Sequence, residues 1–560
     1  MFRRFVLWLM CGLAAAAFTF FASAQTNGQL FFSASPIDPS DAKLPADAVL
    51  VQKVGDEYCL FLPGAFGSGD LYACGTGFSS VTVGNRAYKP DEPVSGIEPG
   101  TKIKITVGSW TRTVRVYQGS NIRAVFLNTD SGSFDYVNKS KSNEEAGSLL
   151  VLTGGGLDEY RGKVDKIRIR GNSTLAFSKK NYNIKLSEKA DLGGMGKSKK
   201  WTLVSSVKDR SLLRNQIVFD MARYAGLKYT PDLVPCDVWL NHSYFGEYIL
   251  TERIEIAKHR IDVYDLEEAT EAVNSAKPET YPRAGAQKLK YGQFKYFDIP
   301  NDPEDITGGY ILEYENYQPR YSGDPSAYTT TRGKVLLIKE PEAASYAQAQ
   351  YISRFIQGYE NAIFAPDGID PDSGKHYWEF VDMESLVLKY ILEEFSKNED
   401  GNASSQYYFK PSDRESTVAF AGPAWDYDCT FGGYATSGKT TLLNAKGFYT
   451  NRANNNKYWW PQLYARPEFL AAVKAMWAER FRPAADILLG KEKDPASVLR
   501  SIAEYADEIR ASANMNFVRW PVHYSGENVA ETGRSFSANV EYLSSFIQRR
   551  AAFLDDNWLK

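Results

Sequence analysis

The chain has 560 residues, of which 43% are hydrophobic and 24% charged, and its formal net charge is only −3. A chain of this length is too long for a single hydrophobic core, so we expect two or more domains. The near-neutral charge excludes the broad electrostatic attraction that draws proteins to nucleic acid, and we expect no nucleic-acid partner.

The first residues have the pattern of an export signal. Arg3 and Arg4 precede an apolar stretch at residues 5–21, and the Ala-Ser-Ala sequence at 22–24 is typical of a cleavage site. We therefore expect a signal peptide at residues 1–24 and an exported protein, periplasmic, on the cell surface or secreted. An uncleaved signal anchor is the alternative. No later apolar run is long enough to span a membrane, so no transmembrane segment is expected after cleavage.

Cysteine and histidine are sparse. Beyond the signal, Cys59 and Cys74 are predicted at the two sides of a hairpin, where export permits a local disulfide. Cys236 and Cys429 are predicted as buried strand residues. No CxxC occurs, and the four histidines are far apart, so neither a zinc cluster nor a Ser-His-Asp triad is expected.

A small β module is predicted at residues 25–120. Short strands alternate with Gly and Pro turns, which is typical of a sandwich-like arrangement. A linker is predicted at residues 118–121. The predicted strands are 49–54, 57–62, 70–74, 102–107 and 112–117.

The main domain is placed at residues 122–560, where strands and helices are mixed. A helix is predicted from Asp209, which can cap it, to Gly226, which can end it. A hairpin is predicted around Asn241-His242-Ser243. The strand-like runs are 122–127, 166–170, 182–186, 234–240 and 244–251.

Helical patterns dominate the second half. Residues 271–305, rich in Pro, Gly and charge, are predicted to be a long surface insertion. Apolar residues on one face predict a helix from Met383 to Phe395, and helices are expected from Pro461 onward. This order of elements predicts an α+β fold and is compatible with two lobes.

Two carboxylates form the strongest candidate site. Asp426 and Asp428 follow a predicted strand at residues 417–421, and such a pair suits a hard cation such as Mg²⁺. Asp400 follows the predicted helix directly, in a loop where a kinase places the carboxylate that orients the acceptor hydroxyl. Taken alone, such acids are more often solvated turn residues.

Several motifs in series resemble the spore-coat protein H (CotH) kinase-like family. Arg170-Gly171-Asn172-Ser173-Thr174 resembles the RGNST signature of that family, and residues 179–186 resemble its following basic strand. The matches occur in family order from about residue 122 to the C-terminus and do not cover the β module. The further matching positions are 209, 211–215, 229–231, 240–241, 246–248, 250–252, 308–313 and 422–428.

The resemblance implies a fold, cofactors and site residues. It implies a two-lobed, atypical protein-kinase-like domain that binds ATP and Mg²⁺ or Mn²⁺ between its lobes. Asp400 would be the catalytic-loop aspartate, Asp426 the metal-binding aspartate and Asp428 a second metal ligand. Arg214 and Asn215 would lie on the helix that faces the nucleotide.

The phosphate-contacting lysine is less sharply specified by the resemblance. Lys185 is the candidate strand lysine, and Lys199 and Lys200 compete with it. Glu252 is expected near the hinge between the lobes.

One position departs from the kinase pattern. Many kinase-like relatives carry, five residues beyond the catalytic-loop aspartate, an Asn that binds the second metal. This chain has Ser405 there, and Asn402 is close but differently spaced. A hydroxyl binds Mg²⁺ more weakly than an amide or carboxylate oxygen, so the departure puts second-metal binding and turnover in question.

A rival motif lies just beyond the carboxylates. Residues 433–440 match the P-loop pattern GxxxxGK[ST] letter for letter. A P-loop needs a buried strand before it and a long helix after it, whereas carboxylates precede this one and a short stretch ending near Gly447 follows. We interpret the match as coincidence and rank a P-loop hydrolase last among the alternatives.

Two functions follow from the sequence. The first is an exported protein kinase that transfers the γ-phosphoryl group of ATP to Ser or Thr of a protein at the cell surface or in the periplasm. The second is a non-catalytic, kinase-fold module for binding or surface assembly. Ser405 and the scarcity of ATP outside the cytoplasm favour the second.

Overall fold

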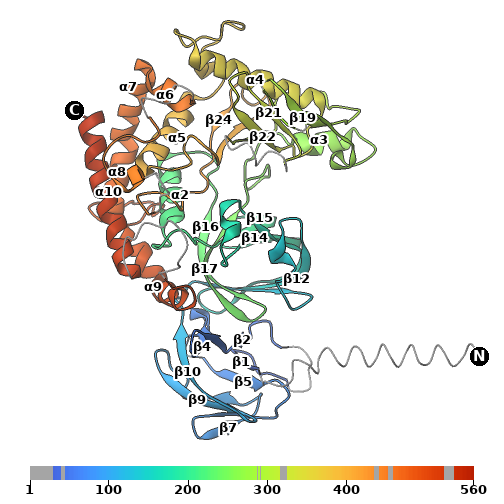
Figure 1. Ribbon diagram of the computed structural model, residues 1–560, viewed down its shortest axis with the longest axis vertical. Coiled ribbons are helices and arrows are strands. Elements are labelled where there is room, and N and C mark those ends of the chain that lie inside the picture. Colours follow the sequence, from blue (N-terminus) through green and yellow to red (C-terminus); the bar gives the residue numbers. More distant parts are fainter. Residues whose placement is uncertain are drawn as a thin grey trace, which may run out of the picture.

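The computed structural model describes residues 29–38, 44–67, 69–286, 288–290, 292–315, 324–433, 440–451, 458–521 and 535–560 (Figure 1). The predicted signal peptide lies outside these ranges. Among the helices that they contain, none combines the length and the apolar character needed to cross a membrane.

Two sheets form the N-terminal part of the molecule, which lies at the bottom of Figure 1. The four-stranded sheet has the order β2-β1-β5-β8 and the six-stranded sheet the order β3-β4-β10-β9-β6-β7. One apolar cluster contains residues of both sheets. The strands are β1 (Leu30–Ser33), β2 (Val49–Leu50), β3 (Gln52–Val54), β4 (Glu57–Leu62), β5 (Leu71–Gly75), β6 (Val81–Val83), β7 (Arg86–Tyr88), β8 (Pro93–Val94), β9 (Lys102–Val107) and β10 (Trp110–Gln118).

A closed barrel of seven strands follows, in the order β11-β12-β13-β14-β15-β17-β16. Along β14 the side chains alternate, so Tyr182, Ile184 and Leu186 fill the barrel while Lys185 faces outward. The predicted hairpin around residues 241–243 is confirmed as β16 and β17. The strands are β11 (Arg123–Thr129), β12 (Glu145–Leu152), β13 (Asp158–Arg170), β14 (Asn181–Asp191), β15 (Lys197–Val204), β16 (Leu233–Leu240) and β17 (Ser243–Glu252).

The N-terminal sheets pack directly on the barrel. Phe126, Trp239 and Tyr244 of the barrel belong to the apolar cluster of these sheets, and Phe61 stacks on Tyr244 with ring centroids 4.8 Å apart. Met515 of helix α9 (Ile502–Arg519) joins the same cluster. The two parts therefore share a core, and burial of that core stabilises both.

The predicted local disulfide between Cys59 and Cys74 is wrong. Cys59 lies on β4 and Cys74 on β5, which belong to different sheets rather than to one hairpin, and both thiols are free. Cys236 is buried on β16, as predicted. Cys429 is buried, but it lies in a turn rather than a strand.

Helix α2 (Arg214–Ala225) begins five residues later than predicted. Asp209 precedes the helix, and its carboxylate accepts hydrogen bonds from the backbone N–H groups of Ser211 (2.8 Å) and Arg214 (2.8 Å). The aspartate thus closes a turn that leads into the helix. Gly226 ends the helix in the left-handed conformation (φ 93°), as predicted.

A seven-stranded sheet, in the order β18-β19-β21-β22-β20-β23-β24, lies beyond the barrel. Residues 271–305 were predicted to be an insertion, but β18 and β19 within them extend this sheet, because β19 pairs with β21. Local composition could not reveal that pairing. The elements are α3 (Leu266–Ala272), β18 (Arg283–Gly285), β19 (Phe294–Phe297), β20 (Tyr310–Tyr314), β21 (Ala327–Thr329), β22 (Val335–Glu340), β23 (Gln406–Lys410) and β24 (Phe420–Ala421).

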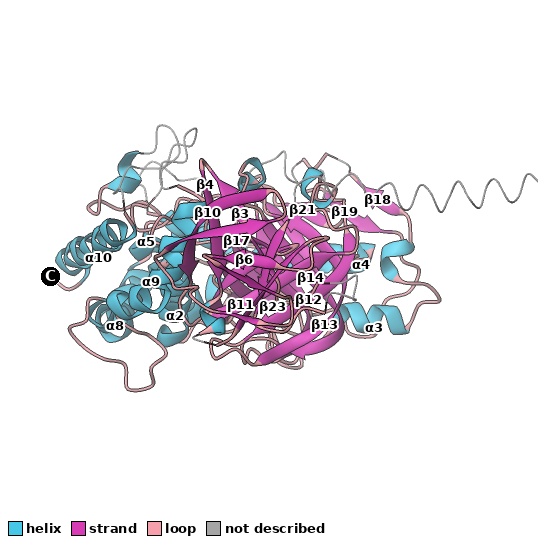
Figure 2. Ribbon diagram, turned by 90° about the horizontal axis from the view of Figure 1, so that it is seen from below, coloured by secondary structure: helices cyan, strands magenta, loops and turns pink. Residues whose placement is uncertain are grey.

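Helices α2, α5, α8, α9 and α10 gather at one side of the strands, as Figure 2 shows from below. The predicted helix at 383–395 is confirmed as α5, and its residues are almost entirely buried. The helices beyond α3 are α4 (Tyr346–Phe364), α5 (Met383–Ser396), α6 (Trp459–Tyr464), α7 (Pro467–Met476), α8 (Arg482–Leu488), α9 and α10 (Phe536–Trp558).

A buried polar junction joins α9 to the barrel. The Asp237 carboxylate accepts hydrogen bonds from Ser512 Oγ (2.6 Å) and Tyr244 OH (3.0 Å). Lys179 Nζ donates to Asn516 Oδ1 at 3.0 Å. Burial raises the pKa of Asp237 to about 7 and that of the neighbouring Glu247 to about 8.

Because of the raised pKa values at this junction, we expect the free energy of unfolding to fall as the pH rises from about 5 to about 8. Asp237 and Glu247 have pKa values above those of ordinary carboxyls, so over this range the folded state holds more protons than the unfolded state. Melting temperatures measured across the range should therefore decline. Asp237→Asn should flatten the decline, and an unchanged slope would contradict this origin.

Candidate functional site

The two carboxylates lie in a loop that leaves the edge of the seven-stranded sheet. β24 covers only Phe420 and Ala421, so the strand predicted at 417–421 is shorter than expected. The loop at 422–428 carries Asp426 and Asp428 from that edge toward α2.

Asp426 and Ser405 are held in strained backbone conformations beside one another. Both have positive φ, 66° at Asp426 and 55° at Ser405. The Ser405 hydroxyl donates a 3.3 Å hydrogen bond to Asp426 Oδ2. Non-glycine residues in this region cost about 1–3 kcal/mol each and cluster at functional sites. The contact brings Ser405 to Asp426, the aspartate that the resemblance predicts to bind a metal.

Helix α2 positions the carboxylate loop. The backbone N–H of Tyr427 donates a 2.8 Å hydrogen bond to Asn215 Oδ1 on the first turn of the helix. Asn215 therefore contacts the backbone of the carboxylate loop. A small cavity lies beside this contact, lined by Arg170, Val204, Asn215, Phe219, Leu233, Ile249, Thr251, Trp425 and Asp426.

Asp428 is buried beside Asp426. Burial and then the charge of Asp426 raise the pKa of Asp428 to about 6, and the nearby Lys208 ammonium opposes the rise. Lys208 also donates a 2.8 Å hydrogen bond to Ser173 Oγ in the Arg170–Thr174 motif. Two close carboxylates that repel one another favour a bound cation.

Asp400 joins the same acidic group. Burial raises the pKa of the Cys429 thiol well above its usual value, and the charges of Asp428, Asp400 and Asp426 add to the rise. The charges of all three carboxylates thus raise the pKa of the same buried thiol, that of Cys429. The backbone N–H of Asp400 donates to Asn398 Oδ1 (3.1 Å), which fixes the loop directly after α5. The structure brings together Asp426, Asp428, Ser405 and Asn215, and the charge of Asp400 reaches the same buried thiol.

Arg170, Glu313 and Tyr407 lie near Asp426 and were not predicted as site residues. Burial lowers the pKa of Arg170, and the charge of Asp426 opposes this most strongly, followed by Tyr407 and Glu313. The Arg170 guanidinium lies over the Trp425 ring, 5.1 Å from its centroid. Arg170 and Glu313 both belong to segments that resemble the family, at residues 170–174 and 308–313. Their position in these segments was the one feature of the sequence that could have indicated a role in the site.

The three candidate lysines lie on neighbouring strands. Lys185 and Lys200 are cross-strand partners on the outer face of the barrel, the face that also carries Val204 and Thr251 of the cavity. Lys200 forms a 2.9 Å ion pair with Glu255, and Lys199 Nζ donates to the Ser187 carbonyl at 2.6 Å. No contact within the described part of the chain joins Lys185 to Asp426.

Arg214 and Glu252 are both held in buried ion pairs. Arg214 is buried and pairs with Asp209, and its Nε donates to the Thr430 carbonyl at 2.7 Å. It therefore fixes the loop after Asp428 rather than facing an open cleft. Glu252 pairs with Arg260 and accepts a 2.8 Å hydrogen bond from the Asp232 N–H. Burial raises the Glu252 pKa to about 7.

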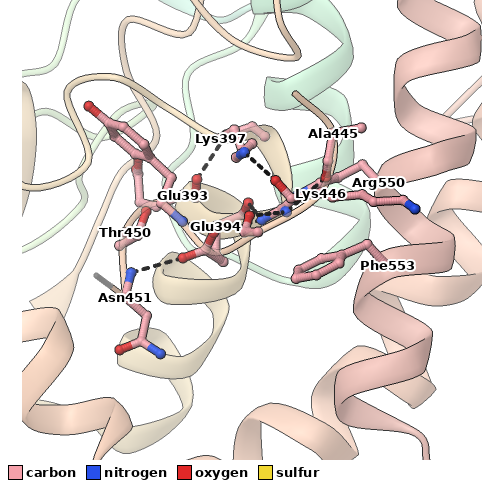
Figure 3. Close-up of polar contacts among 12 residues, drawn as sticks. Glu393, Glu394, Lys397, Ala445, Lys446, Thr450, Asn451, Arg550 and Phe553 are labelled. Carbon is pink, nitrogen blue, oxygen red and sulfur yellow. Dashed lines mark hydrogen bonds and ion pairs between the residues drawn. The ribbon is translucent and has the colours of Figure 1, made fainter. Parts of the chain in front are cut away.

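Most of the P-loop-like motif, residues 434–439, lies outside the residues that the structure describes. A short 3₁₀ helix follows at Thr440–Leu443, in place of the long helix that a P-loop requires. Lys397 at the end of α5 holds the next stretch by donating to the carbonyls of Thr441, Asn444 and Lys446 at 3.0, 2.5 and 2.8 Å. Figure 3 shows this contact beside Glu394 and Arg550.

Within the described ranges, no three His, Cys, Asp or Glu side chains gather as a metal-binding cluster. The carboxylates at 426 and 428 would bind a cation only together with other oxygen ligands, such as Ser405, water or phosphate. A Mg²⁺ ion bound through one or two carboxylates plus substrate phosphates fits that donor set.

A comparison with models of protein families identifies the family of this chain. A family model described as CotH kinase protein matches residues 167–554, which is more than half of the chain and includes every candidate site residue named above. The search of curated proteins returned no match.

Proposed function

Because the chain belongs to the CotH kinase protein family, we propose that it is an atypical protein kinase that transfers the γ-phosphoryl group of ATP to Ser or Thr of a protein. The barrel would form one lobe, and the seven-stranded sheet with its helices the other. The observation that supports the proposal is the fixed carboxylate loop, in which Ser405 donates a hydrogen bond to Asp426 Oδ2 and Asn215 of α2 accepts one from the Tyr427 N–H.

The carboxylates fit a divalent cation with ATP. Asp426 and Asp428 would hold Mg²⁺ or Mn²⁺, which neutralises charge on the transferred phosphoryl group. Asp426 is prepared for this role, because Asn215 fixes the following N–H and Ser405 contacts Oδ2. Arg170 adds a positive charge from the barrel side, next to Asp426.

Asp400 would orient the acceptor hydroxyl. It follows the rigid α5 directly, and its loop is held by Asn398, whose amide donates to the buried Glu393 at 2.8 Å. A carboxylate on a loop fixed in this way can accept a hydrogen bond from a Ser or Thr hydroxyl and direct its oxygen toward the phosphorus atom. Positioning and charge neutralisation account for most of the catalysis in this reaction class.

The acceptor would be a protein outside the cytoplasm. The N-terminal export pattern supports this proposal. The β module would serve as an attachment unit for the same surface, because it packs on the barrel and would carry the kinase domain with it.

One observation favours a second function, a non-catalytic binding module. By sequence spacing Ser405 stands where many kinase-like relatives carry the second-metal Asn, and its hydroxyl donates a hydrogen bond to Asp426 Oδ2. A protein with this arrangement can bind a metal–nucleotide complex through Asp426 without efficient transfer. The two functions share the binding step and differ in turnover.

Nucleotide affinity of two lysine variants tests the binding step. Lys185→Ala should weaken ATP binding by about 1.5–3 kcal/mol, because a charge-assisted phosphate contact is lost. Lys439→Ala should leave binding almost unchanged, since Lys439 belongs to the motif that we interpret as coincidence. Calorimetry of both variants with Mg²⁺–ATP gives the comparison. The opposite pattern would favour a P-loop.

A further inference from the structure

A second cavity, of about 430 Å³, lies on a different face of α2 from the carboxylate site. The rim of the barrel, α2, the turn before α9 and α9 itself form its walls. Its volume is within the range of small-molecule sites. Six planar polar side chains line it: Asn121, Arg123, Gln216, Asp220, Arg500 and Glu508.

Gln216 is an unpartnered amide in this cavity. Only 6% of the residue is exposed, and no described residue forms a hydrogen bond with its side chain. The amide opens into the cavity, so its donor and acceptor are available to water or to a ligand there. Asn121, at the exposed rim, also forms no side-chain hydrogen bond within the described ranges.

The charges that line the cavity cancel. Arg123 is paired with Glu159 at 3.0 Å and Arg500 with Glu508 at 2.6 Å. Asp220 accepts a 2.5 Å hydrogen bond from Tyr505 OH. With two guanidinium groups, two carboxylates and two amides, the lining gives no net attraction to an anion or a cation.

This lining suits hydroxyl groups. A hydroxyl both donates and accepts, so it can accept from a guanidinium or amide and donate to a carboxylate at the same time. One wall is also rigid, because Asp494 accepts hydrogen bonds from the backbone N–H groups of Ala496, Val498 and Leu499 at 3.0, 2.7 and 3.0 Å. A fixed wall lowers the cost of ordering the site around a ligand.

Helix α2 connects this cavity to the carboxylate site. Gln216 and Asp220, one turn apart, line the cavity, whereas Asn215 and Phe219, also one turn apart, line the small cavity beside Asp426. Leu233 lines both. A ligand that fixes Gln216 therefore also fixes the helix turn from which Asn215 holds the Tyr427 N–H.

We propose that this cavity binds a neutral polyhydroxylated molecule, a single sugar ring, and that its occupancy is coupled through α2 to the carboxylate site. The coupling rests on the proposed function, whereas the binding does not. Linkage requires the effect to be reciprocal: if the sugar strengthens nucleotide binding, the nucleotide strengthens sugar binding by the same factor.

Saturation-transfer NMR on the full chain without nucleotide tests the binding. The probes are glucose, galactose and N-acetylglucosamine, with malonate and inorganic phosphate as anionic comparisons. At least one sugar should bind, and Gln216→Leu and Asn121→Ala should each weaken it, the former about tenfold. Gln350→Leu, on the surface of α4, is the matched control and should bind as wild type does.

Failure of every sugar to bind, tighter binding of the anions, or binding that survives Gln216→Leu would overturn the site. Nucleotide titrations with and without the bound sugar then test the coupling, which an unchanged nucleotide affinity would overturn. If the sugar binds and no nucleotide does, the site stands and the proposed function fails.

Discussion

Asp426→Asn should reduce the affinity for Mn²⁺–ATP by more than about a hundredfold. The substitution keeps the shape of the side chain and the contact with Ser405 but removes the charge that a hard cation needs. Loss of an outer-shell partner alone typically costs about 10–100-fold in metal affinity, so loss of a direct ligand should cost more. Calorimetry with Mn²⁺–ATP measures the change.

Ser405→Ala is the matched control for that experiment. Its hydroxyl contacts the same oxygen, Asp426 Oδ2, but carries no charge, so its removal should cost far less than Asp426→Asn. Equal affinities of wild type and Asp426→Asn would remove Asp426 from the metal site. Equal and large losses for both variants would instead indicate that the loop geometry, rather than the carboxylate, is decisive.

Arg550→Met should destabilise the fold by about 3–5 kcal/mol, the cost of breaking a buried ion pair from one side. Arg550 of α10 and Glu394 of α5 are both fully buried, and Arg550 Nη2 donates to Glu394 Oε1 at 2.6 Å. Arg550 Nη1 also donates to the carbonyls of Ala445 and Gly447 (Figure 3). Among the described residues, its loss would leave the buried Glu394 carboxylate with two partners, the backbone N–H groups of Tyr449 and Asn451.

Chemical and thermal unfolding measure this loss, and two further variants identify its origin. Arg549→Met changes an exposed neighbour on the same helix and should leave stability within about 0.5 kcal/mol of wild type. The double variant with Glu394→Gln should recover part of the loss, because it removes the uncompensated charge. A loss as small as that of Arg549→Met would show that the pair does not hold α10 to α5.

Local sequence patterns were sufficient to predict those elements whose structure is determined by neighbouring residues in the chain. The hairpin at 241–243 and helix α5 follow from turn residues and from apolar spacing, and both are confirmed. The family resemblance also drew attention to Asp426, Ser405 and Asn215, of which Ser405 contacts the Asp426 side chain and Asn215 the backbone N–H of Tyr427.

Long-range pairing was beyond the sequence. The barrel closes because β11 pairs in parallel with β16, so that Ala124 lies opposite Asp237. Nothing in either strand alone specifies this partner. For the same reason Arg170 and Glu313, which are far apart in the chain, were not recognised as neighbours of Asp426.

The partners in the buried ion pairs could not be predicted from the sequence either. Arg214 and Glu252 have the residue types of a phosphate or nucleotide contact, but Asp209 and Arg260 satisfy them in the interior. Asp209 lies in the turn before α2, and Arg260 lies in the segment after β17. The spacing of residues in the sequence does not show that these two segments fold back to meet Arg214 and Glu252.

Incubation of the purified protein with γ-labelled ATP and Mn²⁺ or Mg²⁺ tests the central proposal most directly. We predict transfer of label to the protein itself or to an added exported protein, and loss of that transfer in Asp426→Ala and Asp400→Ala. Label in the wild type that persists in both variants would contradict the assignment of the site. Tight nucleotide binding with no transfer under either metal would contradict the kinase function and establish the binding module.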